Sequence, residues 1–229
     1  AFLFGWFAFS SRVTGVYLST EGEMLLLGKS IAGKPTYEIT NSGIARTFQN
    51  IRLFKSMTVI ENIKVAFQSR MYYTMLDGSL RDTYYDREED GCDRRARELL
   101  RVFDMEHLAD SSANSLPYGQ QRKLEICRAM ASNPKVLLLD EPAAGMNPIE
   151  TEELMATIRL IRERFSVTIL LIEHDMKLVM GICERIYVLN YGRVIAEGTP
   201  AEIKNNPEVI RAYLGTGADK AQKEASATC

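Results

Sequence analysis

The stretch that decides the fold runs from Val136 to Glu141 and reads VLLLDE. Its four consecutive apolar residues predict a parallel strand that is buried on both faces. Ligands of parallel sheets bind beyond the carboxyl ends of the strands, which is where Asp140 and Glu141 stand. Packing does not explain two adjacent acids at the end of a buried strand. They indicate a site for a metal ion and a phosphate, and an ordinary acidic pair at a helix start is the plain alternative.

Strand and helix signals alternate on both sides of this stretch. Thr58 and Glu61 form a capping-box pattern that predicts a helix through about Ala66. Tyr191 and Gly192 lie between two apolar runs and predict a hairpin. Further strands are expected at 22–27, 44–48, 167–172, 186–189 and 194–196, and further helices at 119–132, 154–165 and 176–183. This alternation predicts an α/β fold with a largely parallel sheet.

The chain divides by character into a core and an insert. We expect the core at residues 13–66 and 116–215, and a mainly helical subdomain at 67–115, where apolar residues recur at helical spacing. Residues 1–12 do not match the core pattern. Residues 216–229 are small, polar and charged, which predicts a flexible tail.

Composition narrows the possible functions. The formal net charge of −2 gives no electrostatic basis for nucleic-acid binding. The four cysteines are far apart and form no CxxC pair, which argues against a disulfide framework or a zinc site and favours a reducing compartment. The apolar run at residues 1–9 is too short to span a bilayer, which takes about 20 residues.

A second motif, SLPYGQQR at residues 115–122, is expected to begin a helix. Gly119 near a helix start lets a phosphate approach free backbone N–H groups, and the helix dipole favours an anion there. An ordinary turn with a proline near the helix start is the alternative. It leaves the paired glutamines and the neighbouring VLLLDE strand unexplained.

Taken in order, these segments resemble the ATPases of ABC transporters. LPYGQQR at 116–122 and LLLDEP at 137–142 are similar to the family's signature and Walker B motifs. Gln49 in TFQ resembles the Q-loop, Asn147 in GMNP the D-loop and His174 in EHD the switch histidine. The resemblance covers residues 13 to 215. Three longer runs, ARTFQNIRLF, EPAAGMNP and IEHDMKLVM, resemble the ATP-binding subunits of branched-chain amino acid importers, and of their two ATPases the one usually lettered G.

This resemblance implies an ABC-ATPase fold, similar to P-loop NTPases, that binds ATP and Mg²⁺. Glu141 and His174 would be catalytic, with Glu141 orienting or activating water and His174 contacting the γ-phosphate. Asp140 and Gln49 would hold Mg²⁺. The nucleotide-binding positions that the family implies are Gln49, Leu116, Tyr118, Gly119, Gln120 and Asn147. His107 is expected to be an ordinary structural or surface histidine.

The resemblance also implies the partners. They are transmembrane permease subunits and a second ABC ATPase subunit, in a homodimer or heterodimer; a binding protein outside the membrane takes part only indirectly. No nucleic-acid partner is expected. The chain would lie at the cytoplasmic face of the plasma membrane as a peripheral subunit. The alternative is a non-catalytic or truncated ABC remnant that acts as an interaction module. A second, weaker alternative is a soluble ABC protein that acts in repair or translation.

One element of the family pattern is absent from the sequence: the Walker A string Gly-x-x-Gly-x-Gly-Lys-Ser/Thr. Counting back from Thr14 places Gly5 at the last loop glycine, Trp6 where the lysine belongs and Phe7 where the serine or threonine belongs. The strand that precedes this loop is expected to be missing too. We expect its loss to leave residues 136–139 with an unpaired edge, unless the run at residues 2–9 fills the gap as a makeshift strand. Pro117 stands where many ABC proteins have serine.

Overall fold

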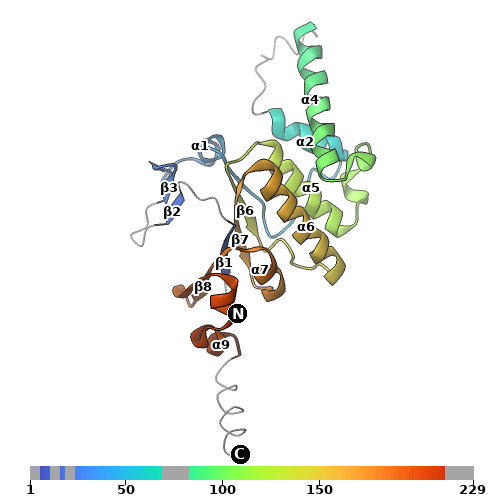
Figure 1. The fold of residues 1–229 in the computed structure, drawn as a ribbon. Helices are drawn as coiled ribbons and strands as arrows, with labels where there is room; N and C mark the ends of the chain where they lie inside the picture. Colours follow the sequence, from blue (N-terminus) through green and yellow to red (C-terminus); the bar gives the residue numbers. More distant parts are fainter. Residues whose placement is uncertain (1–5, 11–15, 19–23, 69–82, 215–229) are drawn as a thin grey trace, which may run out of the picture.

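The computed structural model describes residues 6–10, 16–18, 24–68 and 83–214 (Figure 1). Its centre is a six-stranded sheet. In spatial order the strands are β5 (Ile44–Arg46), β6 (Val136–Asp140), β7 (Thr168–Glu173), β1 (Trp6–Ser10), β8 (Arg185–Asn190) and β9 (Arg193–Gly198). β5, β6 and β7 are parallel to one another, whereas β1 is antiparallel to both its neighbours and β9 is antiparallel to β8. β8 therefore runs in the same direction as β5, β6 and β7, so four of the six strands point the same way, and the expected α/β fold with a largely parallel sheet is confirmed.

The position of β1 corrects one expectation and confirms another. β6 pairs with β5 on one side and β7 on the other, so the prediction that residues 136–139 would have an unpaired edge is wrong. β1 lies instead between β7 and β8, where it pairs Trp6 with Glu173 and with Val188, so the apolar N-terminal run does supply a strand of the sheet. Hydrogen bonding of the open edges of β7 and β8 explains this insertion, because backbone groups pair regardless of side chain.

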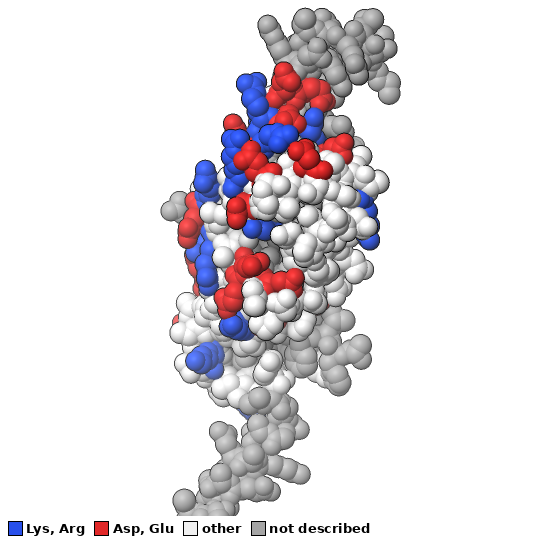
Figure 2. Space-filling view, turned by 90° about the vertical axis from the view of Figure 1, so that its right-hand side faces the viewer, with Lys and Arg blue, Asp and Glu red and all other residues white. Residues whose placement is uncertain are grey.

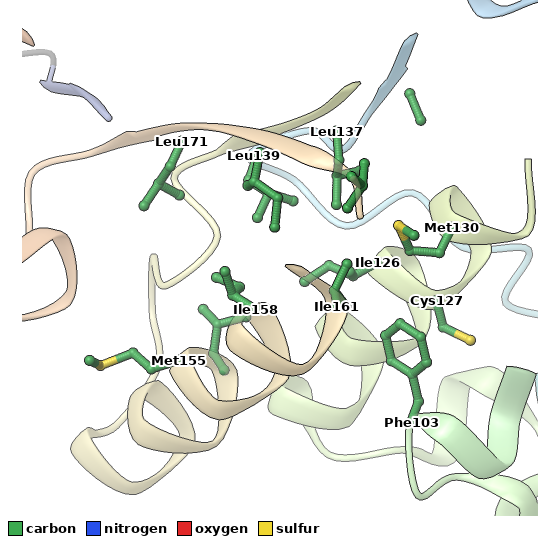
Figure 3. Close-up of a cluster of buried hydrophobic side chains, with 14 of the residues drawn as sticks. Phe103, Ile126, Cys127, Met130, Leu137, Leu139, Met155, Ile158, Ile161 and Leu171 are labelled. Atoms are coloured by element: carbon green, nitrogen blue, oxygen red, sulfur yellow. The ribbon is translucent and has the colours of Figure 1, made fainter. Parts of the chain in front are cut away.

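The core lies between this sheet and two long helices (Figure 3). These are α5 (Tyr118–Ala131) and α6 (Pro148–Phe165). Leu137, Leu139 and Leu171 of the strands lie opposite a set of buried residues from the helices: Ile126, Cys127 and Met130 of α5, and Met155, Ile158 and Ile161 of α6. The helical periodicity of these apolar positions is what aims one face of each helix at the sheet.

The helix predicted at the end of the first core stretch is α2 (Val59–Gln68). The segment expected to be mainly helical, 67–115, holds α4 (Thr83–Val102) and the short helices η1 (Glu106–Leu108) and η2 (Ala113–Ser115). Residues 69–82 of it lie outside the described part. The capping box at the start of α2 is present: the Thr58 backbone N–H donates to Glu61 at 2.7 Å and the Glu61 N–H donates to Thr58 Oγ1 at 3.3 Å. α2 packs against α4 and α5, and α4 projects away from the sheet (Figure 1). Along α4, both signs of charge are interspersed (Figure 2).

The remaining elements surround the main sheet. A second, three-stranded sheet holds β2 (Val16–Leu18), β3 (Met24–Leu26) and β4 (Lys29–Ser30), and it is followed by α1 (Thr36–Asn41). α7 (Met176–Ile182) follows β7, and α8 (Pro200–Lys204) and α9 (Pro207–Leu214) follow β9. The predicted hairpin joins β8 to β9, with positive φ at both Tyr191 and Gly192. Among the described residues, no helix has the length and apolar character to cross a membrane. The expected flexible tail lies outside the described residues.

Candidate functional site

The two acids that follow the buried strand stand at the carboxyl edge of the sheet. Asp140 ends β6 and forms an ion pair with Arg46 of β5, with 2.7 Å between Arg46 Nη2 and Asp140 Oδ2. Glu141 leaves the strand with φ of 42°, and its backbone N–H donates to the carbonyl of Ile172 at 2.8 Å. A positive φ at a residue other than glycine is uncommon and is concentrated at functional sites. This turn separates the Glu141 carboxylate from the ladder of the strand.

Gln49 and His174 both lie against the Glu141 carboxylate. Gln49 Nε2 donates to Glu141 Oε2 at 2.7 Å. His174 follows β7, and its Nδ1 is 3.7 Å from Glu141 Oε1 on the other side. Four residues that the sequence named as catalytic or metal-binding (Asp140, Glu141, Gln49 and His174) are therefore brought to one edge of the sheet.

The backbone around Gln49 is fixed by a buried charge pair on α5. The guanidinium of Arg122 donates to the carbonyls of Phe48 and Gln49, both at 2.6 Å, and to Glu125 Oε2 at 2.7 Å. Glu125 Oε1 in turn accepts the backbone N–H of Arg52 at 3.1 Å. The side chains of Arg122 and Glu125 are 0% and 3% exposed. Sequence reasoning did not identify this pair, although two opposite charges at i and i+3 within an otherwise apolar helix face were a usable signal.

A second group of named residues lies at the N-terminal ends of α5 and α6. The Gly119 N–H donates to Glu150 Oε1 at 3.2 Å, while Glu150 Oε2 accepts the Asn147 N–H at 3.0 Å. Asn147 caps α6 in return through its Oδ1, so Glu150 connects the starts of both helices. A Cβ on Gly119 would lie 3.0 Å from Glu150 Oε1, so any larger residue here would push the Glu150 side chain aside.

Three other nucleotide-binding candidates also lie at this end of α5. The Tyr118 hydroxyl donates to the carbonyl of Ala144 at 2.9 Å, in the turn that follows the Walker B strand. Leu116 is buried and its carbonyl accepts Gln121 Nε2 at 2.8 Å. Gln120 lines a cleft of about 530 Å³ between α5, α6 and the helical segment, together with Gly119 and Glu150. The two groups of candidates are linked through α5, because Tyr118 and Arg122 contact the segments that carry Glu141 and Gln49.

The first group has donors of the kind that Mg²⁺ prefers. Asp140 presents a carboxylate that is 25% exposed. The Gln49 amide uses its nitrogen on Glu141, which leaves its oxygen as the atom available to a hard cation. One carboxylate and one amide oxygen, completed by substrate phosphate and water, suit Mg²⁺. The described residues therefore fit a magnesium ion at this edge.

The described cysteines are poor candidates for a nucleophile. Burial raises the pKa of the Cys183 thiol to about 12 and also raises the pKa of Cys127. A thiolate is the reactive form, so both groups are inert near neutral pH.

Comparisons with known proteins place this site in a family. The family model described as ABC transporter matches residues 10–144, and the one described as branched-chain amino acid ATP-binding cassette transporter matches residues 193–219. The high-affinity branched-chain amino acid transport ATP-binding protein LivG of Escherichia coli K12 is 50% identical over 204 residues, which cover 89% of this chain and 80% of that protein. BraF of Pseudomonas aeruginosa, with the same description, is 47% identical over 203 residues, again 89% and 80%.

A solved structure agrees. The ADP conformation of MJ1267, described as an ATP-binding cassette of an ABC transporter, is similar with a TM-score of 0.70 and 30% identity, covering 86% of this chain and 78% of that one. The matched residues 10–144 include Gln49, the segment 115–122, Asp140 and Glu141. The chain belongs to the ATP-binding proteins of ABC transporters.

Proposed function

We propose that this chain is the ATP-hydrolysing subunit that energises import of branched-chain amino acids through an ABC transporter. We take the transported substrate, a branched-chain amino acid, from the descriptions of the relatives LivG and BraF. The ATPase subunit supplies energy and does not itself need a pocket for the amino acid.

The observation that carries the proposal is the convergence of Asp140, Glu141, Gln49 and His174 at one edge of the sheet. In this arrangement Glu141 orients or activates the attacking water, because its carboxylate is held between Gln49 and His174. Asp140 and the oxygen of Gln49 would hold a magnesium ion, which when bound would supply positive charge to the phosphates. We assign the contact with the γ-phosphate to the imidazole of His174.

The second group of residues supports an ATPase dimer. The N-terminus of α5 offers its helix dipole to an anion from a partner subunit, and the Gly119 N–H would join it on exchanging the Glu150 carboxylate for that anion. MJ0796, a bacterial ABC transporter cassette with a solved dimeric structure, is similar to this chain with a TM-score of 0.63 and 25% identity. On the Q-loop side Phe48 and Phe54 are exposed, and we assign this face to permease subunits. The chain would then lie at the cytoplasmic face of the membrane.

One observation favours a second candidate function. The sequence has no Gly-x-x-Gly-x-Gly-Lys-Ser/Thr string to cradle the β- and γ-phosphates. A chain without this loop can still offer the N-terminus of α5 to the nucleotide held by an intact partner. In this second candidate the chain is a non-catalytic member of a heterodimer.

A chimaera separates the two candidates. Residues 1–12 are replaced by the strand and Walker A loop of a LivG relative, and the chimaera is reconstituted with the permease subunits in vesicles. We expect ATP hydrolysis coupled to leucine uptake, and we expect Glu141→Gln in the chimaera to abolish hydrolysis and to accumulate an ATP-bound dimer. Glu163→Gln, which changes an exposed glutamate on α6, is the matched control and should keep full activity.

Two results would contradict the assignment. Hydrolysis at the chimaera's own rate after Glu141→Gln would remove Glu141 from catalysis. An unaltered chain that supports ATP hydrolysis only when mixed with an intact partner cassette, with Gly119→Ala abolishing the effect, would favour the second candidate.

A further inference from the structure

Glu173, the last residue of β7, is a buried carboxylate that the mechanism above does not use. It is 2% exposed. Its Oε1 accepts the backbone N–H of Ala143 at 2.9 Å. Its Oε2 accepts the N–H of His174 at 2.9 Å and of Asp175 at 3.3 Å. All three donors are backbone groups, and they come from two different turns.

These two turns carry the two candidate catalytic side chains. Ala143 lies two residues after Glu141, in the turn that follows β6. His174 begins the turn that follows β7, and Asp175 caps α7 by accepting the N–H groups of Lys177 and Leu178. Each oxygen of the carboxylate serves one turn. The Glu173 side chain is thus a bridge between the loop of Glu141 and the loop of His174.

Core packing alone does not require an acid at this position. An unpaired buried carboxylate is strongly unfavourable, and here three N–H donors compensate the lost hydration. A buried apolar residue would leave those donors unsatisfied. A glutamine has only one acceptor oxygen, and its NH₂ group would face the N–H of one turn or the other. Only a carboxylate accepts from both turns at once.

We propose that Glu173 is a positioning residue that fixes the His174 imidazole against the Glu141 carboxylate by holding both turns. Nδ1 of His174 is 3.7 Å from Glu141 Oε1 and also 3.7 Å from Glu173 Oε2, so this ring nitrogen is equally distant from the two carboxylates. The importance of this geometry for hydrolysis rests on the proposed function; the geometry itself does not.

The test uses the full 229-residue chain without nucleotide, so its outcome does not depend on ATPase activity. The chain has two histidines, which makes the ring signals of His174 and His107 easy to assign by NMR. His107 lies in η1, away from the two turns, and serves as an internal reference. In Glu173→Gln we expect the ring resonances of His174 to shift while those of His107 stay unchanged. Amide exchange should accelerate at Ala143 or at His174 and Asp175 by roughly tenfold or more.

Glu173→Asp is the second variant, because it keeps the charge and is shorter by one methylene. We expect it to keep the bonds to the adjacent His174 and Asp175 N–H groups and to lose the reach to Ala143. Exchange should then accelerate at Ala143 alone. This variant decides the question if Glu173→Gln does not fold.

Glu163→Gln provides the matched control and should change none of these signals. The proposal is overturned if His174 and the three amides are unaffected in Glu173→Gln. Acceleration spread evenly over all slow amides would also overturn it, because that pattern reports a loss of global stability. Failure of the chimaera to hydrolyse ATP, with the His174 shift present, would contradict the proposed function and leave the positioning role intact.

Discussion

Replacement of Arg122 by methionine tests whether the buried charge pair on α5 fixes the Q-loop. The change keeps the length of the side chain and removes the cation. Glu125, 3% exposed, then loses its charged partner, and the carbonyls of Phe48 and Gln49 lose their donors. Breaking a buried ion pair from one side destabilises by about 3–5 kcal/mol. That is a large share of a total stability of roughly 5–15 kcal/mol.

Urea unfolding at 25 °C and thermal melting are the assays. For a chain of this size each kcal/mol moves Tm by about 2–4 °C, so we expect Tm to fall by roughly 10 °C. The double variant Arg122→Met with Glu125→Leu removes both charges. It should regain about 2 kcal/mol over the single variant, because no uncompensated charge stays buried. Arg164→Met, an exposed arginine on α6, is the control and should stay within about 0.5 kcal/mol of the unaltered chain.

Two results would refute this reasoning. One is a single Arg122→Met variant within about 1 kcal/mol of the unaltered chain, which would mean that water reaches Glu125. The other is a double variant that is no more stable than the single one. In that case the hydrogen bonds to the Q-loop carbonyls, rather than the unpaired charge, would dominate the loss.

Three further predictions follow from the described contacts. Hydrogen bonds from the backbone and side chain of Thr199 lower the pKa of Glu202 below its ordinary 4.5, so this cap stabilises α8 above that pH and is lost as the pH falls through the lowered pKa. The difference in Tm between the unaltered chain and Glu202→Gln should accordingly be largest above pH 4.5 and shrink as the pH falls below that value. Glu150→Ala should destabilise the chain by about 1 kcal/mol in urea, because the capping box at α6 loses one member, and amide exchange at Gly119 should accelerate. The unaltered chain, which has no Walker A string, should show no micromolar binding of Mg-ATP in a calorimetric titration, and micromolar binding by a soluble monomer would contradict this.

Local sequence predicted most of the fold because the deciding signals are local. The run VLLLDE gave a buried strand, Thr58 and Glu61 gave the cap of α2, and Tyr191 with Gly192 gave a hairpin, each from a few adjacent residues. The direction of β1 could not be predicted in this way. Apolar composition favours an extended buried segment, but the same composition pairs equally well in either direction.

The candidate site, like the fold, could be predicted only in part from local sequence. The order of the motifs identified Asp140, Glu141, Gln49 and His174 as site residues. It did not identify Arg46, Glu150 and Glu173, which hold these residues or the neighbouring turns by ion pairs and hydrogen bonds. Their roles arise from contacts across long stretches of sequence, such as the 94 residues between Arg46 and Asp140. Acids and arginines are expected at the surface on composition grounds, so burial of Glu173 becomes evident only when the turns around it are placed.

β1 completes the sheet, but its direction prevents the segment after it from forming a phosphate-binding site beside Asp140. Because β1 is antiparallel to β7, its first residue, Trp6, pairs with Glu173, and its last residue, Ser10, pairs with Ile169. β1 therefore ends at the edge of the sheet opposite to Asp140. A loop that binds phosphate after its strand needs the strand to run the other way, parallel to β6. Glycine and lysine substitutions within or after residues 6–10 would consequently not create such a loop, and only exchange of the whole segment reverses its polarity.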